Sequence, residues 1–447
     1  MGDPERPVYQ GAVAIDGDGS RVGFFRSGID APSSLLVRNV PRAHTRRVMR
    51  PDPDYRYGSY ATGKIRSYGF KFPDFTPDGR YLVLGTAYRL VPEDRNRYLD
   101  VYRYDWTTKE FVLVSAGPDG RPGDSQSVAA SISDDGNLVA FSSASTDLVP
   151  GDTNRTTDVF LRNVALATTT RVSVANDGAQ AERAPVEGYD EHVYGASFNG
   201  AISGDGSRVA FASHADNLVP GDTNRAADAF VRDLTAGTTT RVSVTSTGEQ
   251  LEPLEYSESA SSFRDGVDDV ELSGDGRIVV FQSHADGLVE DDHNANVDIF
   301  MHEIATGVTE RVSEPTGGGD AYGEEARSCG TNGQCFGFIR SHTISISYDG
   351  DRVFFMSGGP HLTDVDRDGT SRAQDAFVHD RSTKVTQLVN RRRDGTWAGG
   401  VHEYGGMISA DGRSVTYTSG ARGIVRHDPH QGSDVFLQGL DDAAFGE

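Results

Sequence analysis

Residues 202–244 contain one complete copy of a repeated structural unit. The copy reads Ile202-Ser-Gly-Asp-Gly206, then Val209-Ala-Phe211, then Asp228-Ala-Phe-Val-Arg232, and finally Thr240-Arg-Val-Ser-Val244. The Asp-Gly pair predicts a tight turn between two short strands, and the later segments alternate apolar and polar residues as strands do. No helical period competes with this pattern. We therefore expect four consecutive antiparallel strands in this stretch.

The same unit returns along the whole chain. A Ser-x-Asp-Gly tetrad, or a close variant followed by an apolar run, has its glycine at Gly19, Gly79, Gly136, Gly206, Gly276, Gly350 and Gly412. Four-stranded units repeated in this way predict an all-β fold, a single seven-bladed β-propeller of antiparallel blades over residues 1–447. The expected blades are 12–50, 73–115, 128–174, 200–244, 269–313, 344–389 and 406–440.

The two ends of the chain suggest how the ring closes. The last copy stops after Asp434-Val-Phe-Leu437 and lacks a fourth strand, whereas a spare extended stretch, Arg6-Pro-Val-Tyr-Gln10, precedes the first copy. Closing the ring removes sheet edges that would otherwise pair with other chains. We therefore expect residues 6–11 to join the last blade as its fourth strand.

Composition restricts the partners. The 43 Lys and Arg residues against 66 Asp and Glu residues give a net charge of −23, which repels nucleic acid. No apolar run approaches the length of a membrane span, and the opening residues Met-Gly-Asp-Pro-Glu-Arg-Pro lack the apolar core of a signal peptide. A leader removed from a precursor stays possible. We expect a monomer with no nucleic-acid partner and no membrane span.

Two cysteines, Cys329 and Cys335, lie six residues apart with two glycines between them. That separation allows the geometry of a disulfide, and two thiols without a CxxC motif are a poor zinc site. We expect a disulfide, which implies an oxidising compartment and therefore a secreted or periplasmic protein.

The repeat resembles a known family. The Asp-Gly turn, the Val-Ala-Phe-x-Ser strand and the Asp-Val-Phe-x-Arg strand are similar to the TolB-type bacterial propeller repeat across all seven units. This resemblance implies the fold, and for function it implies several classes: protein-binding domains, sugar-binding proteins and polysaccharide lyases. No N-terminal α/β domain like that of TolB precedes the propeller in this sequence, which weighs against a TolB-like envelope scaffold.

The connections between strands predict which face binds. The first and third connections of each unit are short, and they lie on the same face of an antiparallel blade. The blade-to-blade links lie on the opposite face, and five of them are long: 51–72, 175–199, 245–268, 314–343 and 390–405. Long loops on a rigid scaffold are where binding residues gather. This second face, here called the loop-rich face, is the predicted site.

Acidic loops on the loop-rich face suggest calcium. Four of them contain Asp-x-Asn-x-x-x-Asp: Asp94, Asn96 and Asp100; Asp152, Asn154 and Asp158; Asp222, Asn224 and Asp228; Asp292, Asn294 and Asp298. Oxygen side chains in alternation can wrap a hard cation, and the alternative is an Asx turn that begins the next strand. The sixth unit matches a calcium loop more fully, with predicted ligands Asp364, Asp366, Asp368, Asp375 and the Thr370 carbonyl. We expect structural calcium there.

Titratable and aromatic residues in the long links leave catalysis open. The catalytic candidates are His192, Tyr194, Arg340, His342, His402 and Tyr404, and the substrate-binding candidates are Tyr68, Lys71, Tyr189, Arg391, Arg392 and Trp397. Such groups suit β-elimination from an acidic sugar, and they equally suit loop packing or ligand binding. We favour a calcium-stabilised protein that binds a glycan or protein on the loop-rich face. The alternatives are a polysaccharide lyase or glycoside hydrolase acting at the channel mouth, or an envelope scaffold.

Overall fold

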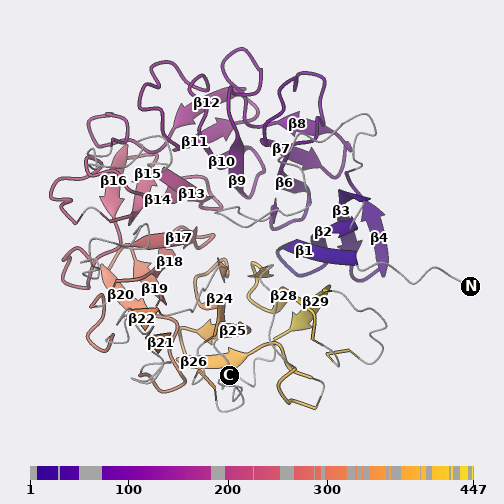
Figure 1. Ribbon diagram of the computed structural model, residues 1–447, viewed down its shortest axis with the longest axis vertical. Helices are drawn as coiled ribbons and strands as arrows, with labels where there is room; N and C mark the ends of the chain where they lie inside the picture. The colour runs from indigo at the N-terminus through magenta and orange to yellow at the C-terminus, as the bar shows by residue number, and fades with distance from the viewer. Residues whose placement is uncertain are drawn as a thin grey trace, which may run out of the picture.

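The computed structural model confirms a seven-bladed, all-β propeller. It describes residues 8–28, 31–49, 73–182, 197–224, 226–251, 266–285, 287–292, 297–319, 328–329, 335–336, 343–358, 362–363, 374–392, 394–398, 405–421, 424–425, 433–440 and 445. Figure 1 shows the sheets arranged radially around a central axis, with strands such as β1, β9, β13 and β17 nearest to it. Within the described residues, no helix is long and apolar enough to cross a membrane.

Each blade is an antiparallel sheet whose strands follow chain order from the axis outward. Blade 1 contains β1 (Val8–Ile15), β2 (Arg21–Gly28), β3 (Ala31–Asn39) and β4 (His44–Arg47). Blade 2 contains β5 (Asp74–Phe75), β6 (Tyr81–Thr86), β7 (Asp100–Asp105) and β8 (Phe111–Leu113). Blade 3 contains β9 (Ser127–Ile132), β10 (Leu138–Ser143), β11 (Asp158–Asn163) and β12 (Thr168–Arg171). Blade 4 contains β13 (Ser197–Ile202), β14 (Arg208–Ser213), β15 (Asp228–Asp233) and β16 (Thr238–Arg241).

The remaining blades follow the same plan. Blade 5 contains β17 (Val267–Leu272), β18 (Ile278–Ser283), β19 (Asp298–Glu303) and β20 (Val308–Arg311), and a separate hairpin of β21 (Ser328–Cys329) and β22 (Cys335–Phe336) follows it. Blade 6 contains β23 (Ile344–Ile346), β24 (Arg352–Ser357), β25 (Asp375–Asp380) and β26 (Val385–Leu388). Blade 7 has β27 (Gly406–Ile408), β28 (Ser414–Ser419) and β29 (Asp434–Gly439) among the described residues.

The repeated tetrad forms the turn between the first two strands of each blade, as predicted. In blade 4, the Ser203 hydroxyl donates to Oδ1 of Asp205 at 2.7 Å, and the same carboxylate accepts the backbone N–H of Ser207 at 2.8 Å. Gly206 then takes a φ of 71°, a left-handed conformation that glycine adopts without strain. The serine, aspartate and glycine of the tetrad therefore each have a specific role in the turn.

The hydrophobic core lies between neighbouring blades. In blades 3, 4 and 5, a phenylalanine of the second strand stacks on one from the third, as Phe211 does on Phe230 with ring centroids 5.8 Å apart. The apolar residues of adjacent blades then form shared clusters, such as the one that joins Ala212 of blade 4 to Phe281 of blade 5. Burial of apolar area between blades, at about 25 cal/mol per Å², holds the ring together.

The structure does not show the predicted closure by an N-terminal strand in blade 7. Residues 8–10 instead begin β1 and pair with β2, with Val8 opposite Gly28 and Gln10 opposite Arg26. Pairing within blade 1 satisfies the backbone groups that the prediction assigned to blade 7. Arg6, which opens the predicted strand, lies outside the described residues.

Blades 7 and 1 are joined at the turns near the axis. The N–H of Asp411 in blade 7 donates to the carbonyl of Gly17 in blade 1 at 2.9 Å. Equivalent backbone bonds link blades 1 and 2, 3 and 4, 4 and 5, 5 and 6, and 6 and 7. The donor is the residue before the turn aspartate in blades 1, 3, 4 and 6, and the aspartate itself in blades 5 and 7. In blade 2 the first of these two positions is Pro77, which has no N–H to donate. Among the described residues, backbone bonds between these turns therefore join every neighbouring pair of blades except blades 2 and 3.

Candidate functional site

A cavity of about 220 Å³ lies on the central channel, and the innermost strands of all seven blades contribute to its lining. It extends from the turns, where Gly17 and Gly204 line it, along the strands to residues such as Asp74 and Thr343 at their opposite ends. Those opposite ends are the points to which the blade-to-blade links return, so this end of the channel belongs to the loop-rich face. The cavity is the candidate site.

A side chain crosses the channel at the turn end. The Tyr348 hydroxyl of blade 6 donates to Oδ2 of Asp134 in blade 3 at 2.9 Å. The Tyr348 ring lies over Gly274, where an added Cβ would come within 2.1 Å of a ring carbon. Burial, followed by the bond to Asp134, raises the pKa of Tyr348 to about 12, so the hydroxyl keeps its proton and remains the donor. The turn end of the channel is therefore bridged.

The cavity lining is acidic. Its charged side chains are Asp74, Asp134, Asp268, Asp269 and Glu271, and no lysine, arginine or histidine is among the described lining residues. Burial raises the pKa of the Asp134 carboxyl. Carboxylates only accept hydrogen bonds when ionised, so the cavity presents acceptors and negative charge.

Asn199 of β13 adds an unused acceptor to this lining. Its side chain is buried, and its amide nitrogen donates to the Asp268 carbonyl at 3.1 Å and to Oδ1 of Asp269 at 3.0 Å. Its Oδ1 has no hydrogen-bond partner among the described residues. A φ of 54° at this residue accompanies an irregularity in the pairing of β13 with β14. Asparagine adopts that left-handed conformation more readily than most residues.

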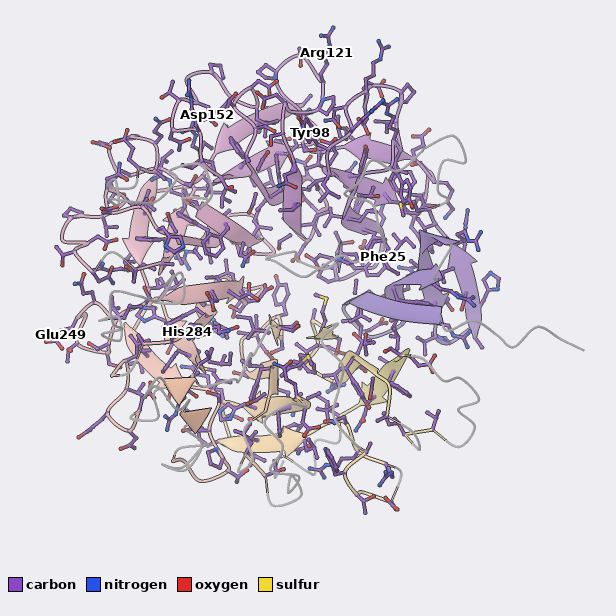
Figure 2. All side chains as sticks on the ribbon, viewed as in Figure 1. Phe25, Tyr98, Arg121, Asp152, Glu249 and His284 are labelled. Atoms are coloured by element: carbon purple, nitrogen blue, oxygen red, sulfur yellow. The ribbon has the colours of Figure 1, made fainter. Side chains whose placement is uncertain are left out.

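His284 is a second residue near the cavity that the sequence did not single out. It lies in a Ser-His-Ala-Asp segment that the repeat also places at His214. Its Nε2 lies 2.8 Å from Oδ2 of Asp268, a residue of the cavity lining. Figure 2 shows His284 nearer to the axis than Glu249, which lies at the outer edge of the ring. The Asn199-Gly200 pair was the available sequence signal for this region, because Asn-Gly inside a strand indicates an irregular backbone.

Most of the predicted catalytic and substrate-binding residues lie outside the described residues. These are His192, Tyr194, Arg340, His342, His402, Tyr404, Tyr68, Lys71 and Tyr189. The calcium-loop residues Asp364, Asp366, Asp368 and Thr370 also lie outside them. The predictions that rest on these residues therefore stay predictions.

The structure describes three of the predicted binding residues, Arg391, Arg392 and Trp397, and one predicted calcium ligand, Asp375. Trp397 and Asp375 interact with each other within blade 6. Trp397 packs against the core between blades 5 and 6, and its indole N–H donates to Oδ1 of Asp375 at 2.9 Å. The same oxygen accepts the amide of Asn390 at 2.5 Å. Arg391 is half-buried, and burial lowers its pKa, whereas Arg392 bonds through its backbone to Thr396.

In blades 3 and 4, an arginine from the fourth strand lies between the first and last aspartates of the acidic loop. Nη1 of Arg241 lies 3.3 Å from Oδ1 of Asp222 and 3.5 Å from Oδ2 of Asp228. The amide of Asn224 donates to the same Oδ2, and its Oδ1 accepts the N–H of Ala226, which is the Asx-turn alternative. Among the described residues, no group of three or more His, Cys, Asp or Glu side chains is arranged to hold a metal ion.

The cysteine pair lies in the short hairpin after blade 5. Cys329 of β21 is directly opposite Cys335 of β22 in the backbone register. Opposite residues in an antiparallel pair have Cα atoms about 4.5–5.5 Å apart, which is within the range of disulfides. The register is therefore compatible with the predicted disulfide.

Comparisons with known proteins agree with the fold. An oligogalacturonate lyase in complex with manganese is 13% identical, with a TM-score of 0.50, and the match covers 98% of this chain and 92% of the other. A protein of Agrobacterium tumefaciens assigned as TolB is 16% identical, with a TM-score of 0.42 and coverage of 91% and 98%. No protein-family model and no curated protein matches the chain. At these identities, the likeness shows a seven-bladed β-propeller and no particular activity.

Proposed function

We propose that this propeller is a binding protein that recognises a glycan or a protein segment on its loop-rich face, with the channel cavity at the centre of the site. The observation that carries the proposal is the cavity itself, bridged at the turn end by Tyr348 and lined by five carboxylate residues. A concave pocket with a few convergent polar groups on a rigid scaffold is a common place for ligands to bind.

The lining selects for ligands that donate hydrogen bonds. The carboxylates of Asp134 and Asp268 and the unpartnered Oδ1 of Asn199 can accept bonds from hydroxyl and ammonium groups, and ionised carboxylates repel anions. A cavity of about 220 Å³ holds a small group, such as one sugar ring or one basic side chain, and not a polymer. The ligand would therefore insert a neutral or basic end into the channel and contact the rim with the rest.

The same lining does not favour action on an acidic polysaccharide. A uronate entering the channel would meet the negative charge of lining residues such as Asp134. The residues predicted for β-elimination lie outside the described residues, so the lyase alternative has no observation in its support.

Calcium in the 364–375 loop and a Cys329–Cys335 disulfide are further parts of the proposal. Both would stabilise a secreted or periplasmic protein.

The test is a binding screen with a matched charge variant. The protein is applied to arrays of neutral, amino-sugar and acidic glycans and to basic peptides, and the best ligand is titrated against Asp268→Asn. We expect the best ligand to be neutral or basic, and the variant to lose at least tenfold in affinity. Glu249→Gln removes one charge at the outer edge of the ring and serves as the control (Figure 2). Preference for acidic glycans, or equal binding by both variants, would refute the proposal.

A further inference from the structure

Three acidic loops share one way of balancing charge. In blades 3, 4 and 5, the last strand carries an arginine opposite a phenylalanine of the third strand: Arg171 opposite Phe160, Arg241 opposite Phe230, and Arg311 opposite Phe300. Each guanidinium contacts the first aspartate of its loop, at 3.4, 3.3 and 3.5 Å respectively. The side chains of these first aspartates are almost fully buried. A buried carboxylate without a nearby cation would be strongly destabilising, so the arginine is needed to balance its charge.

Blade 2 repeats the loop and omits the arginine. Leu113 occupies the arginine position, opposite Tyr102 where the other three blades have phenylalanine. The Tyr102 hydroxyl donates to Oδ2 of Asp94 at 2.5 Å. A neutral donor has thus replaced a cation, although both loop aspartates are present and buried, Asp94 at 4% and Asp100 at 0% exposed.

One oxygen of this pair is left without a partner. Oδ1 of Asp100 accepts the Ser115 hydroxyl at 2.7 Å, but Oδ2 has no hydrogen-bond partner among the described residues. The Asn96 amide donates to the Gly123 carbonyl at 3.2 Å, as the amides of Asn154 and Asn224 do to the matching carbonyls of their blades. It also lies close enough to Asp100 to lower the pKa of that carboxyl. In blades 3 and 4, the equivalent amide donates to the third aspartate at 2.9 and 3.1 Å. Blade 3 also has a buried loop oxygen without a hydrogen bond, Oδ1 of Asp152, but the Arg171 guanidinium lies 3.4 Å from it. Among the described residues, the unpartnered oxygen of Asp100 has no such cation beside it.

No described residue forms an ion pair with Asp94 or Asp100. The guanidinium of Arg89, which precedes the loop, donates to the backbone carbonyls of Arg95 and Asn96. Burial raises the pKa of Asp100, and the charge of Asp94 raises it further. An open surface hollow lined by Arg89, Arg95 and Asp94, among others, lies beside Asp94.

We propose that the loop of residues 94–100 in blade 2 binds a calcium ion between Asp94 and Asp100, at the position that arginine fills in blades 3, 4 and 5. Two carboxylates match a divalent cation in charge, and Oδ2 of Asp100 supplies a free oxygen ligand. The oxygens of Asp94 accept one hydrogen bond each, from Asn96 N–H and Tyr102, and each keeps a lone pair. Water and loop carbonyls complete the shell.

The experiment counts calcium ions bound per chain by isothermal titration. Leu113→Arg restores the arginine of the other loops and should remove one calcium ion relative to the wild type. Asp100→Asn should remove the same ion. It provides a second test of the site if the arginine variant does not fold. Leu113→Met preserves size and neutrality and should bind as the wild type does. Any calcium bound by the 364–375 loop is common to all four proteins and cancels.

The other loops provide the reverse test. Arg171→Leu in blade 3 removes the arginine, as in blade 2, and should add one calcium site to the chain. The proposal is overturned if Leu113→Arg and the wild type bind equal numbers of calcium ions, or if the wild type binds none. A wild type that binds none but whose melting temperature rises as the pH falls would show that a proton, not a metal ion, neutralises the pair.

Discussion

Replacing Arg171 by leucine tests how the propeller keeps buried carboxylates in its outer loops. The Arg171 side chain is 8% exposed, and it lies 3.4 Å from Asp152 and 3.7 Å from Asp158, which are 2% and 0% exposed. It also donates to the Gln180 side chain at 2.8 Å. Figure 2 shows Asp152 in the outer part of blade 3. Removing one member of a buried charge network costs about 3–5 kcal/mol, because the remaining charges stay desolvated. We expect that loss in the free energy of unfolding.

The pH dependence of this loss follows from Asp158. Burial raises its pKa to about 6 although Arg171 acts to lower it, so removing the arginine raises the pKa further. The native state then binds more protons than the unfolded state, and stability falls as the pH rises. We therefore expect the difference between variant and wild type to be largest near pH 8 and to shrink towards pH 5. Urea denaturation in a calcium chelator, followed by circular dichroism at both pH values, measures it.

A second substitution provides the control. Phe160→Tyr in the leucine variant recreates the arrangement of Tyr102 and Leu113 in blade 2, and a hydrogen bond to a charged group should recover about 1.5–3 kcal/mol. Phe160→Tyr alone should give no gain, because the arginine already serves the aspartates. A loss below about 1 kcal/mol for Arg171→Leu at pH 8, the range of surface ion pairs, would refute the argument.

Three further outcomes are expected from the channel and the buried acids. Tyr348→Phe should cost about 1 kcal/mol in unfolding free energy, because it removes the donor to Asp134 across the channel; no change in denaturation midpoint would mean that the bond contributes nothing. Gly274→Ala should cost about 1–3 kcal/mol in unfolding free energy, because the added methyl group displaces the Tyr348 ring. In the double variant with Tyr348→Ala, part of that cost should be recovered. If the two single losses simply add, the two residues are not in contact. In chelator, wild-type stability should rise between pH 8 and pH 5, because burial raises the pKa values of Asp100 and Asp222 to about 7; a melting temperature that falls over this range would show that other groups dominate.

Much of the fold followed from local patterns in the chain. The Ser-x-Asp-Gly tetrad forms its turn from its own side chains, as Ser203 and Asp205 do, so the turn needs no distant partner. Alternation in segments such as 240–244 then identifies strands, and seven copies identify a closed ring. The predicted pairing of the N-terminal stretch with the last blade was wrong, because an extended stretch such as residues 6–10 can pair with any free strand edge. Its partner, β2, was available within the first blade.

The sequence by itself determined the class of fold, the number of blades and the face to which the long links belong, because these depend on contacts between residues close in the chain. Only the tertiary structure decided what occupies each repeated position. The link between Tyr348 and Asp134 joins residues 214 positions apart, and the choice between arginine and a free carboxylate oxygen in an acidic loop depends on which side chains the strands bring together. The charge balance of a buried site depends on which side chains the fold brings next to it and not on their spacing in the sequence. Four loops with the same sequence pattern therefore differ in the group that faces their aspartates.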